Sequence, residues 1–238
     1  MTNKSLPTLD SRLSLAASFV RADSVVADIG TDHAYLPIYL VLTDRSKAAI
    51  AADINEGPLE RAKINCEKYG VSDRITLCLA DGLSGLPLEK EGVTDIVICG
   101  MGGELIASII DASEYTKKQG VRLILQPMSQ HARLRTYLCE NGYRTIGGTM
   151  ARAQDRLYQC IVCEYDGQKR SLSPAGLLLG EENINAAPTP VFIDEVKKLI
   201  SKTKKAIQGR TLGGLDNSEL SLLLSELEAI YSNISTNS

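Results

Sequence analysis

The stretch VVADIGTDHAYLP, residues 25–37, decides the fold of this chain. It begins with a short run of apolar and β-branched residues, turns at Gly30 and passes into a helical pattern, which is typical of a strand–helix unit in a parallel sheet. The same alternation of apolar runs and amphipathic segments continues to about residue 120. We therefore expect an α/β fold with a mostly parallel sheet.

Four further apolar runs are expected to form the neighbouring parallel strands. These predicted strands cover residues 48–54, 74–80, 95–100 and 121–127. The helices predicted between and after the strands cover residues 32–42, 58–69, 104–112 and 130–141. This order gives each parallel pair the crossover connection that it needs.

The remaining elements of this region follow from shorter signals. Two strand-like runs, 143–151 and 156–165, are joined by a connection too short for a parallel crossover, so we expect an antiparallel hairpin. Ahead of the first strand, residues 9–20 read LDSRLSLAASFV. They predict a helix with Asp10 or Ser11 at its N-cap.

The last part of the chain has a different pattern. After a stretch bearing Ser, Pro and Gly at 166–190, two amphipathic helices are predicted near 191–208 and 217–231. Glycines between them favour an antiparallel, coiled-coil-like helical hairpin. We therefore predict two domains, an α/β domain at 1–166 and a linker with the helical hairpin at 167–238.

Composition excludes several classes of protein. Of the 238 residues, 44% are hydrophobic and 23% are charged, which excludes intrinsic disorder. No apolar run reaches the roughly 18 residues of a membrane span, and the first residues lack the layout of a secretory signal. The six cysteines are scattered through predicted core strands, as reduced thiols usually are. We expect a cytoplasmic protein with no membrane partner.

Charge is unevenly distributed along the chain. The net charge is −3, but residues 23–116 carry −9 and residues 117–170 carry +6. A second basic stretch, Lys197 to Arg210, holds six basic residues and no acid. Such segments suit contact with a polyanion such as RNA. A solvated surface with local charge bias would show the same pattern.

Acidic residues stand where the first three predicted strands end, which is where ligands bind in an open parallel sheet. Asp28 and Asp32 flank the end of the first strand, and Asp53 and Asp81 follow the second and third. These carboxylates would repel phosphate but suit a cationic, hydroxyl-rich ligand that carries an adenine. Asp53 stands 23 residues after Gly30, a spacing typical of an acid that binds ribose hydroxyls. S-adenosylmethionine, a sulfonium without phosphate, meets these requirements.

Each of these residues also has a simpler interpretation. Asp53 alone would serve a dinucleotide-binding fold equally well, although the first loop lacks the G-x-G-x-x-G motif of such folds. Taken singly, an acid after a strand is more often a helix cap or a turn residue. Asp32 could cap a helix that starts at His33, or act as a carboxylate at a reaction centre. His33 and Tyr35 could simply pack, as single rings on helices usually do.

The cysteines are interpreted as structural. Cys99 lies near the place where cytosine-C5 methyltransferases carry a nucleophile, but its apolar strand favours a buried thiol. Cys160 and Cys163 fall within one predicted strand, where residues three apart point to opposite faces, and no second pair accompanies them. We expect no metal site.

Six segments, in their order and spacing, closely resemble the bacterial tRNA (adenine-N1)-methyltransferases that modify position 22 of tRNA. They are LDSRL, ADIGTDHAYLP, AADINEGP, ADGL, CGMGGELI and LILQP. The resemblance covers essentially the whole chain. It implies a Rossmann-like class I methyltransferase fold, S-adenosylmethionine as methyl donor and the tRNA D-arm as target. The chain departs from the family pattern at Met128, where Asn is expected, and at 151–156, where an acid-rich stretch is expected. It also carries Asp53 where Glu is equally familiar.

The strand ends and the resemblance together predict the site residues. Asp32 is the predicted catalytic residue, because a carboxylate there would orient the adenine 6-amino group and stabilise the developing positive charge. The expected cofactor-binding residues are Asp28, Gly30, Thr31, His33, Asp53, Asn55, Asp81, Gly82 and Gly100. The expected substrate-binding residues are Arg12, Tyr35, Met101, Gly102, Gln126 and Pro127.

The predicted activity is methyl transfer from S-adenosylmethionine to N1 of a D-arm adenine in tRNA. The sequence leaves the oligomeric state open and favours a monomer. The segment GMGG at 100–103 lacks the Asn/Asp-Pro-Pro-aromatic pattern that binds exocyclic amines, which favours a ring nitrogen as acceptor. Two alternatives remain at this point: methylation of another RNA or a small molecule, and a non-catalytic RNA-binding module.

Overall fold

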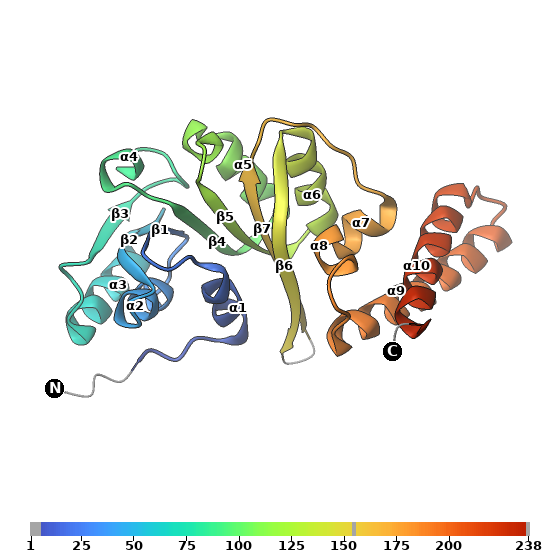
Figure 1. Cartoon of the computed structure of the whole chain (residues 1–238), viewed down its shortest axis with the longest axis horizontal. Coiled ribbons are helices and arrows are strands. Elements are labelled where there is room, and N and C mark those ends of the chain that lie inside the picture. Colours follow the sequence, from blue (N-terminus) through green and yellow to red (C-terminus); the bar gives the residue numbers. More distant parts are fainter. Residues whose placement is uncertain (1–5, 154–155, 237–238) are drawn as a thin grey trace. The chain divides into compact units, whose positions relative to one another are not determined.

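The computed structural model describes residues 6–153 and 156–236, and the chain forms two compact units, Met1–Lys169 and Arg170–Ser238 (Figure 1). The first unit contains a seven-stranded sheet in the order β3-β2-β1-β4-β5-β7-β6. Its strands are β1 (Ser24–Ile29), β2 (Ser46–Asp53), β3 (Ile75–Leu79), β4 (Asp95–Gly102), β5 (Arg122–Ser129), β6 (Tyr143–Ala153) and β7 (Arg156–Tyr165).

Strands β1 to β5 pair in parallel, whereas β7 runs antiparallel to both β5 and β6. The predicted α/β fold, with its mostly parallel sheet and the antiparallel hairpin of β6 and β7, is confirmed. Within the departing segment 151–156, residues 154 and 155 lie outside the described residues.

Helices cover both faces of the sheet. Val26 of β1 and Ile124 of β5 pack into one apolar core, and the residues next to them, Ala27 and Leu125, pack into the other, because side chains alternate along a strand. The first core is completed by α1 (Ser11–Phe19), α2 (Tyr35–Leu42) and α3 (Glu56–Tyr69). The second is completed by α4 (Leu88–Glu91), α5 (Gly103–Asp111), the 3₁₀ helix η1 (Glu114–Lys117) and α6 (His131–Glu140).

Two helix starts show how local chemistry sets the boundaries. Asp10 caps α1 as predicted, since its carboxylate accepts a hydrogen bond of 2.8 Å from the Leu13 N–H. The predicted start of the next helix at residue 32 is wrong. Ala34 adopts a left-handed conformation with φ of 54°, so the chain turns there and α2 begins only at Tyr35.

Strands β4 and β5 continue beyond their predicted ends at residues 100 and 127. Their pairing shifts register between Cys99 and Met101 and again between Met101 and Gly102. These irregularities let the strand pair continue through glycines that sequence patterns treat as a break. As a result, the GMGG segment lies beside the end of the LILQP segment, where Met101 pairs with Pro127.

The second unit is helical. Its long helices α9 (Pro190–Leu212) and α10 (Ser218–Thr236) pack against each other, with Lys204 2.7 Å from Glu228 and Lys197 over the ring of Tyr231. The predicted helical hairpin is confirmed, although its turn starts at Gly213 and not at Gly209. The stretch expected as a linker forms α7 (Pro174–Leu179) and α8 (Glu181–Ile184). In the described part of the chain, no helix is both long and apolar enough to cross a membrane.

The amino-terminal edge of the sheet is fastened by a buried ion pair. The carboxylate of Asp95, at the start of β4, is fully buried and accepts hydrogen bonds from the Arg21 backbone N–H at 2.9 Å and from Nε at 2.8 Å. The same guanidinium donates to the carbonyl oxygens of Thr94 and Gly120, at 2.6 and 2.8 Å. Arg21 thus joins the segments that lead into β1, β4 and β5.

Arg21→Ala should lower the free energy of unfolding by about 3 kcal/mol, because it leaves the Asp95 carboxylate buried with one backbone donor. Urea denaturation measures the change. Arg74→Ala is the matched control, since it removes an exposed Arg–Asp pair of 3.4 Å to Asp44 and should cost less than about 1 kcal/mol. Equal losses in the two variants would contradict a structural role for the buried pair.

Candidate active site

The loop at residues 30–34, which we call the first loop, is tied to the end of β2. The backbone N–H groups of Gly30 and Thr31 both donate to the carbonyl oxygen of Ala52, at 2.8 and 3.0 Å. Gly30 has φ of 77°, and a side chain there would collide with the terminal methyl group of Met101. The first loop therefore requires glycine at its start, and β4 closes against it.

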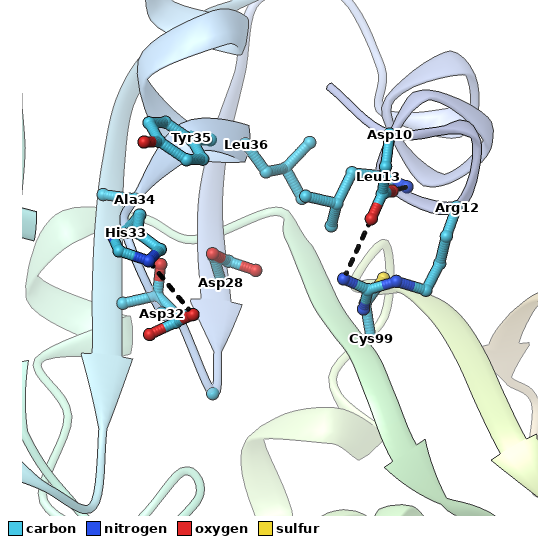
Figure 2. Close-up of a pocket in the computed structure, with 12 residues that line it drawn as sticks. Asp10, Arg12, Leu13, Asp28, Asp32, His33, Ala34, Tyr35, Leu36 and Cys99 are labelled. Atoms are coloured by element: carbon cyan, nitrogen blue, oxygen red, sulfur yellow. Dashed lines mark hydrogen bonds and ion pairs between the residues drawn. The ribbon is translucent and has the colours of Figure 1, made fainter. Parts of the chain in front are cut away.

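A cavity of about 230 Å³ lies between the first loop, α1 and the end of β4 (Figure 2). Figure 2 shows Arg12 of α1 on the side of the cavity opposite Asp32 and His33, with Asp28 between them. Arg12 lies 3.5 Å from Asp10 and also packs over Gly100, where a side chain would meet its guanidinium. The cavity is lined by Asp10, Arg12, Leu13, Asp28, Gly30, Thr31, Asp32, His33, Ala34, Tyr35, Leu36 and Cys99.

Asp28, the penultimate residue of β1, is a buried acid in this cavity. Burial raises its pKa to about 6, because the carboxylate is removed from water. A hydrogen bond with the Thr31 side chain and the positive charge of Arg12 act in the opposite direction, and the charge of Asp53 adds slightly to the increase. The fold therefore keeps a carboxyl group whose burial costs free energy, and such groups are common where a protein binds ligands.

Asp32 has a different environment. Its side chain is 67% exposed, with Oδ1 2.7 Å from Arg61 of α3 and Oδ2 3.3 Å from Nε2 of His33. The His33 ring stacks on Tyr35, with 5.2 Å between ring centroids. Because α2 begins at Tyr35 and its first turn has no side-chain cap, the interpretation of Asp32 as a helix cap is wrong.

The ends of β2 and β3 lie next to the first loop in the sheet. Asp53 accepts hydrogen bonds at Oδ1 from the backbone N–H of Asn55 at 2.8 Å and from its side chain at 3.3 Å. Its carbonyl oxygen accepts from the Ala80 N–H at 2.9 Å, which draws Asp81 toward the same edge. Gly82 has φ of 59° and packs closely against Ile109 of α5.

The ends of β4 and β5 are joined through a buried amide. The Gly100 N–H donates to Oε1 of Gln126 at 3.2 Å, and the same side chain donates from Nε2 to the Pro127 carbonyl oxygen at 2.9 Å. Both Gln126 and Pro127 are buried, whereas Met128 is exposed. A side chain at Gly102 would meet the Ser129 hydroxyl at 3.3 Å.

The structure gathers only part of the predicted site around the cavity. Seven of the predicted residues line it, from Arg12 of α1 to Tyr35 of α2, and the rest follow the same edge of the sheet without lining it. The residues lining the cavity that sequence reasoning missed are Asp10, Leu13, Ala34, Leu36 and Cys99. Burial raises the pKa of the Cys99 thiol well above its usual range, so its interpretation as an unreactive thiol agrees with its setting.

Two exposed apolar residues beside Asp53 were also missed. Ile54 is 60% exposed and Leu79 is 57% exposed, and Leu79 is the register partner of Asp53 across β2 and β3. The sequence did contain a signal for Ile54, since it is an apolar residue directly after an acid at the end of a strand. Elsewhere in the unit, Cys160 and Cys163 are buried, and within the described residues no group of His, Cys, Asp and Glu is arranged to hold a metal ion.

Asp28→Asn should stabilise the ligand-free protein near pH 7.5 by up to about 3 kcal/mol. Between pH 4 and 6 the folded state binds more protons at Asp28 than the unfolded state, so the free energy of unfolding falls as pH rises through this range. The gain should vanish near pH 3, where wild-type Asp28 is largely protonated in both states. Denaturation of both proteins at the two pH values measures it. Asp73→Asn, at an exposed acid outside the cavity, is the control for removing a carboxylate.

Comparison with known proteins agrees with this geometry. A family model described as "Methyltransferase domain" matches residues 9–161. The curated tRNA (adenine(22)-N(1))-methyltransferase of Bacillus subtilis is 38% identical over 180 residues, which cover 72% of this chain and 73% of that protein.

Solved structures extend the likeness to both units. Sp1610 of Streptococcus pneumoniae, in complex with S-adenosyl-L-methionine, matches 94% of this chain and all of its own, with 32% identity and a TM-score of 0.79. TrmK of M. capricolum, in complex with S-adenosyl-homocysteine, matches 95% and 98% of the two chains, with 26% identity and a TM-score of 0.73. The chain belongs to the bacterial tRNA (adenine(22)-N1)-methyltransferase family, as its motifs predict.

Proposed function

We propose that this protein transfers the methyl group of S-adenosylmethionine to N1 of adenine 22 in the D-arm of tRNA. The observation that carries the proposal is the row of carboxylates Asp28, Asp53 and Asp81 at adjacent strand ends, beside a first loop that presents Asp32. This edge suits a cation with ribose hydroxyls and an adenine. The B. subtilis relative bears the name of the same activity.

The residues present fit the cofactor. Among the described residues, Oδ2 of Asp53 has no hydrogen-bond partner, so it is free to accept from ribose hydroxyls. Exposed Ile54 and Leu79 would contact the adenine ring, and Asp81 would accept from its amino group. Asp28 would favour the positively charged end of the cofactor. The remaining residues proposed to bind it are Gly30, Thr31, His33, Asn55, Gly82 and Gly100.

The chemistry requires little proton transfer. When bound, S-adenosylmethionine supplies an electrophilic methyl group on a sulfonium. N1 of the target adenine would attack with a ring lone pair while the sulfur–methyl bond breaks and its electron pair stays on sulfur, so the neutral thioether S-adenosylhomocysteine leaves. No base has to remove a proton first, and the positive charge moves from the sulfonium to the adenine ring. Asp32 would accept a hydrogen bond from the 6-amino group, which orients the base, and its negative charge would stabilise the cation as it forms.

The acceptor base would lie over the first loop and the β4 end. Tyr35 is partly exposed and already stacks on His33, so an extruded adenine could extend this stack. Arg12 of the cavity, together with Met101 and Gly102 of β4, would contact the base there. Buried Gln126 and Pro127 would act on the substrate by fixing the Gly100 backbone.

The basic side chains of α9 would contact tRNA phosphates, which position RNA without specifying its sequence. Among the described residues, Lys202 and Lys205 have no acidic partner, whereas Lys204 pairs with Glu228. The exposed basic side chains of α9 are Lys197, Lys198, Lys202, Lys204, Lys205 and Arg210.

We propose that the protein acts in the cytoplasm as a monomer.

Unmodified bacterial tRNA transcripts treated with the protein and S-adenosylmethionine should give a reverse-transcription stop at adenine 22, because N1 methylation blocks base pairing. Asp32→Ala should lower the rate by about 100-fold or more while calorimetry still detects cofactor binding. Asp44→Ala, at an exposed acid outside the site, should methylate like the wild type. A stop elsewhere, or no stop despite bound cofactor, would assign the protein another acceptor.

The double substitution Lys202→Ala with Lys205→Ala should weaken tRNA binding and reduce the slope of log affinity against log salt concentration by about 1 to 2. Fluorescence anisotropy with labelled tRNA over a series of salt concentrations measures both. The control is Lys47→Ala, since Lys47 lies 3.6 Å from Asp23 in the other unit. An unchanged slope in the double variant would remove α9 from the RNA-binding surface.

A further inference from the structure

One face of α3 holds two successive residues of the first loop. Arg61 and Asn65 are four residues apart and therefore share this face. Nη2 of Arg61 lies 2.7 Å from Oδ1 of Asp32, and the Asn65 side chain donates to the carbonyl oxygen of His33 at 3.0 Å. One contact orients a side chain and the other fixes the backbone next to it.

The first loop needs such support because its backbone is unfavourable at Ala34. Gly30 and Ala34 are both left-handed, with φ of 77° and 54°. Left-handed backbone is disfavoured for alanine, whose Cβ crowds the carbonyl oxygen. The first turn of α2 also has no side-chain cap to hold it. Contacts from outside must therefore keep Asp32 where it is.

The two oxygens of Asp32 are held unequally. Oδ1 meets the fixed, planar guanidinium of Arg61 at 2.7 Å, whereas Oδ2 meets Nε2 of His33 at 3.3 Å. A substrate that donates a hydrogen bond would therefore replace the His33 contact more readily than the Arg61 contact. Oδ2 is the oxygen available to an amino group.

We infer that Arg61 is a positioning residue for methyl transfer: it fixes Oδ1 of Asp32 so that Oδ2 receives the 6-amino group of the target adenine, while Asn65 holds the loop backbone. This inference rests on the proposed function. Arg61 itself does not contact the reacting atoms. Its ion pair is exposed, with Arg61 48% and Asp32 67% accessible, so it adds little to stability and its effect is on orientation.

Steady-state methylation of a tRNA transcript tests the inference. Arg61→Ala should lower kcat by about tenfold or more, because a small displacement of an orienting group slows the reaction strongly. The KM for tRNA and the Kd for S-adenosylmethionine should stay within about twofold, because Arg61 contacts neither. Arg61→Lys should restore kcat only in part, since it keeps the charge but loses the planar fork. Asn65→Ala should lower kcat in the same direction.

Arg74→Ala provides the matched control, because it removes another exposed Arg–Asp contact away from the site. It should leave kcat and KM unchanged. A thermal unfolding scan of each variant should give a Tm close to that of the wild type, so that a loss of kcat cannot be attributed to unfolding.

A double-mutant cycle separates positioning from direct RNA binding. In single-turnover assays, Asp32→Asn with Arg61→Ala should be no slower than Asp32→Asn alone, within about twofold, because Arg61 acts through Asp32. A loss that persists at full size in the Asp32→Asn background, or that appears in the KM for tRNA, would show that Arg61 binds RNA directly and would overturn the inference. So would an unchanged kcat in Arg61→Ala. A wild-type protein that never modifies adenine 22 would instead refute the proposed function.

Discussion

The active edge of this protein depends on the absence of one side chain, at residue 30. Only glycine allows the backbone there to turn left-handed while Met101 packs directly against it. That path lets two successive N–H groups reach the Ala52 carbonyl oxygen, which joins the ends of β1 and β2. The chain then continues over Asp28, buries it, and turns again at Ala34 before α2 can begin. The positions of Asp28 at the end of β1 and of Asp32 in the first loop follow from this single constraint.

The same region departs from the rules that the rest of the chain obeys. Both faces of the sheet bury continuous apolar cores, and α1 has an ordinary N-cap. The end of β1 and the first loop, in contrast, combine a buried carboxyl group whose pKa is raised, Asp28, with a left-handed alanine, Ala34. Such local costs persist only where the surrounding structure enforces them, and they concentrate at functional sites. The cores on the two faces of the sheet supply the stability that offsets them.

Sequence patterns predicted the parts of the fold that arise from burial. Parallel strands covered on both faces are continuous apolar runs, so five of them could be found from the pattern of apolar residues along the chain. The start of α2 could not be predicted, because no sequence pattern indicates a left-handed backbone conformation at Ala34. The contact of Arg61 with Asp32 joins residues 29 apart on different elements, and no local pattern reports it. Asp10 was recognised as a cap, but its place in the cavity depends on how α1 packs on the sheet.

The two ends of the sheet perform different tasks. At the amino ends of β1, β4 and β5, the polar groups of Arg21 and Asp95 satisfy one another inside the protein. At the carboxyl ends, Oδ2 of Asp53 has no hydrogen-bond partner among the described residues and can accept from a ligand. Because the buried Arg21–Asp95 pair and the residues proposed to recognise ligands occupy opposite edges of the sheet, a substitution in the proposed site leaves the contacts of that pair intact. Stability and substrate choice would then depend on different edges of the sheet, so the same fold could acquire new substrates.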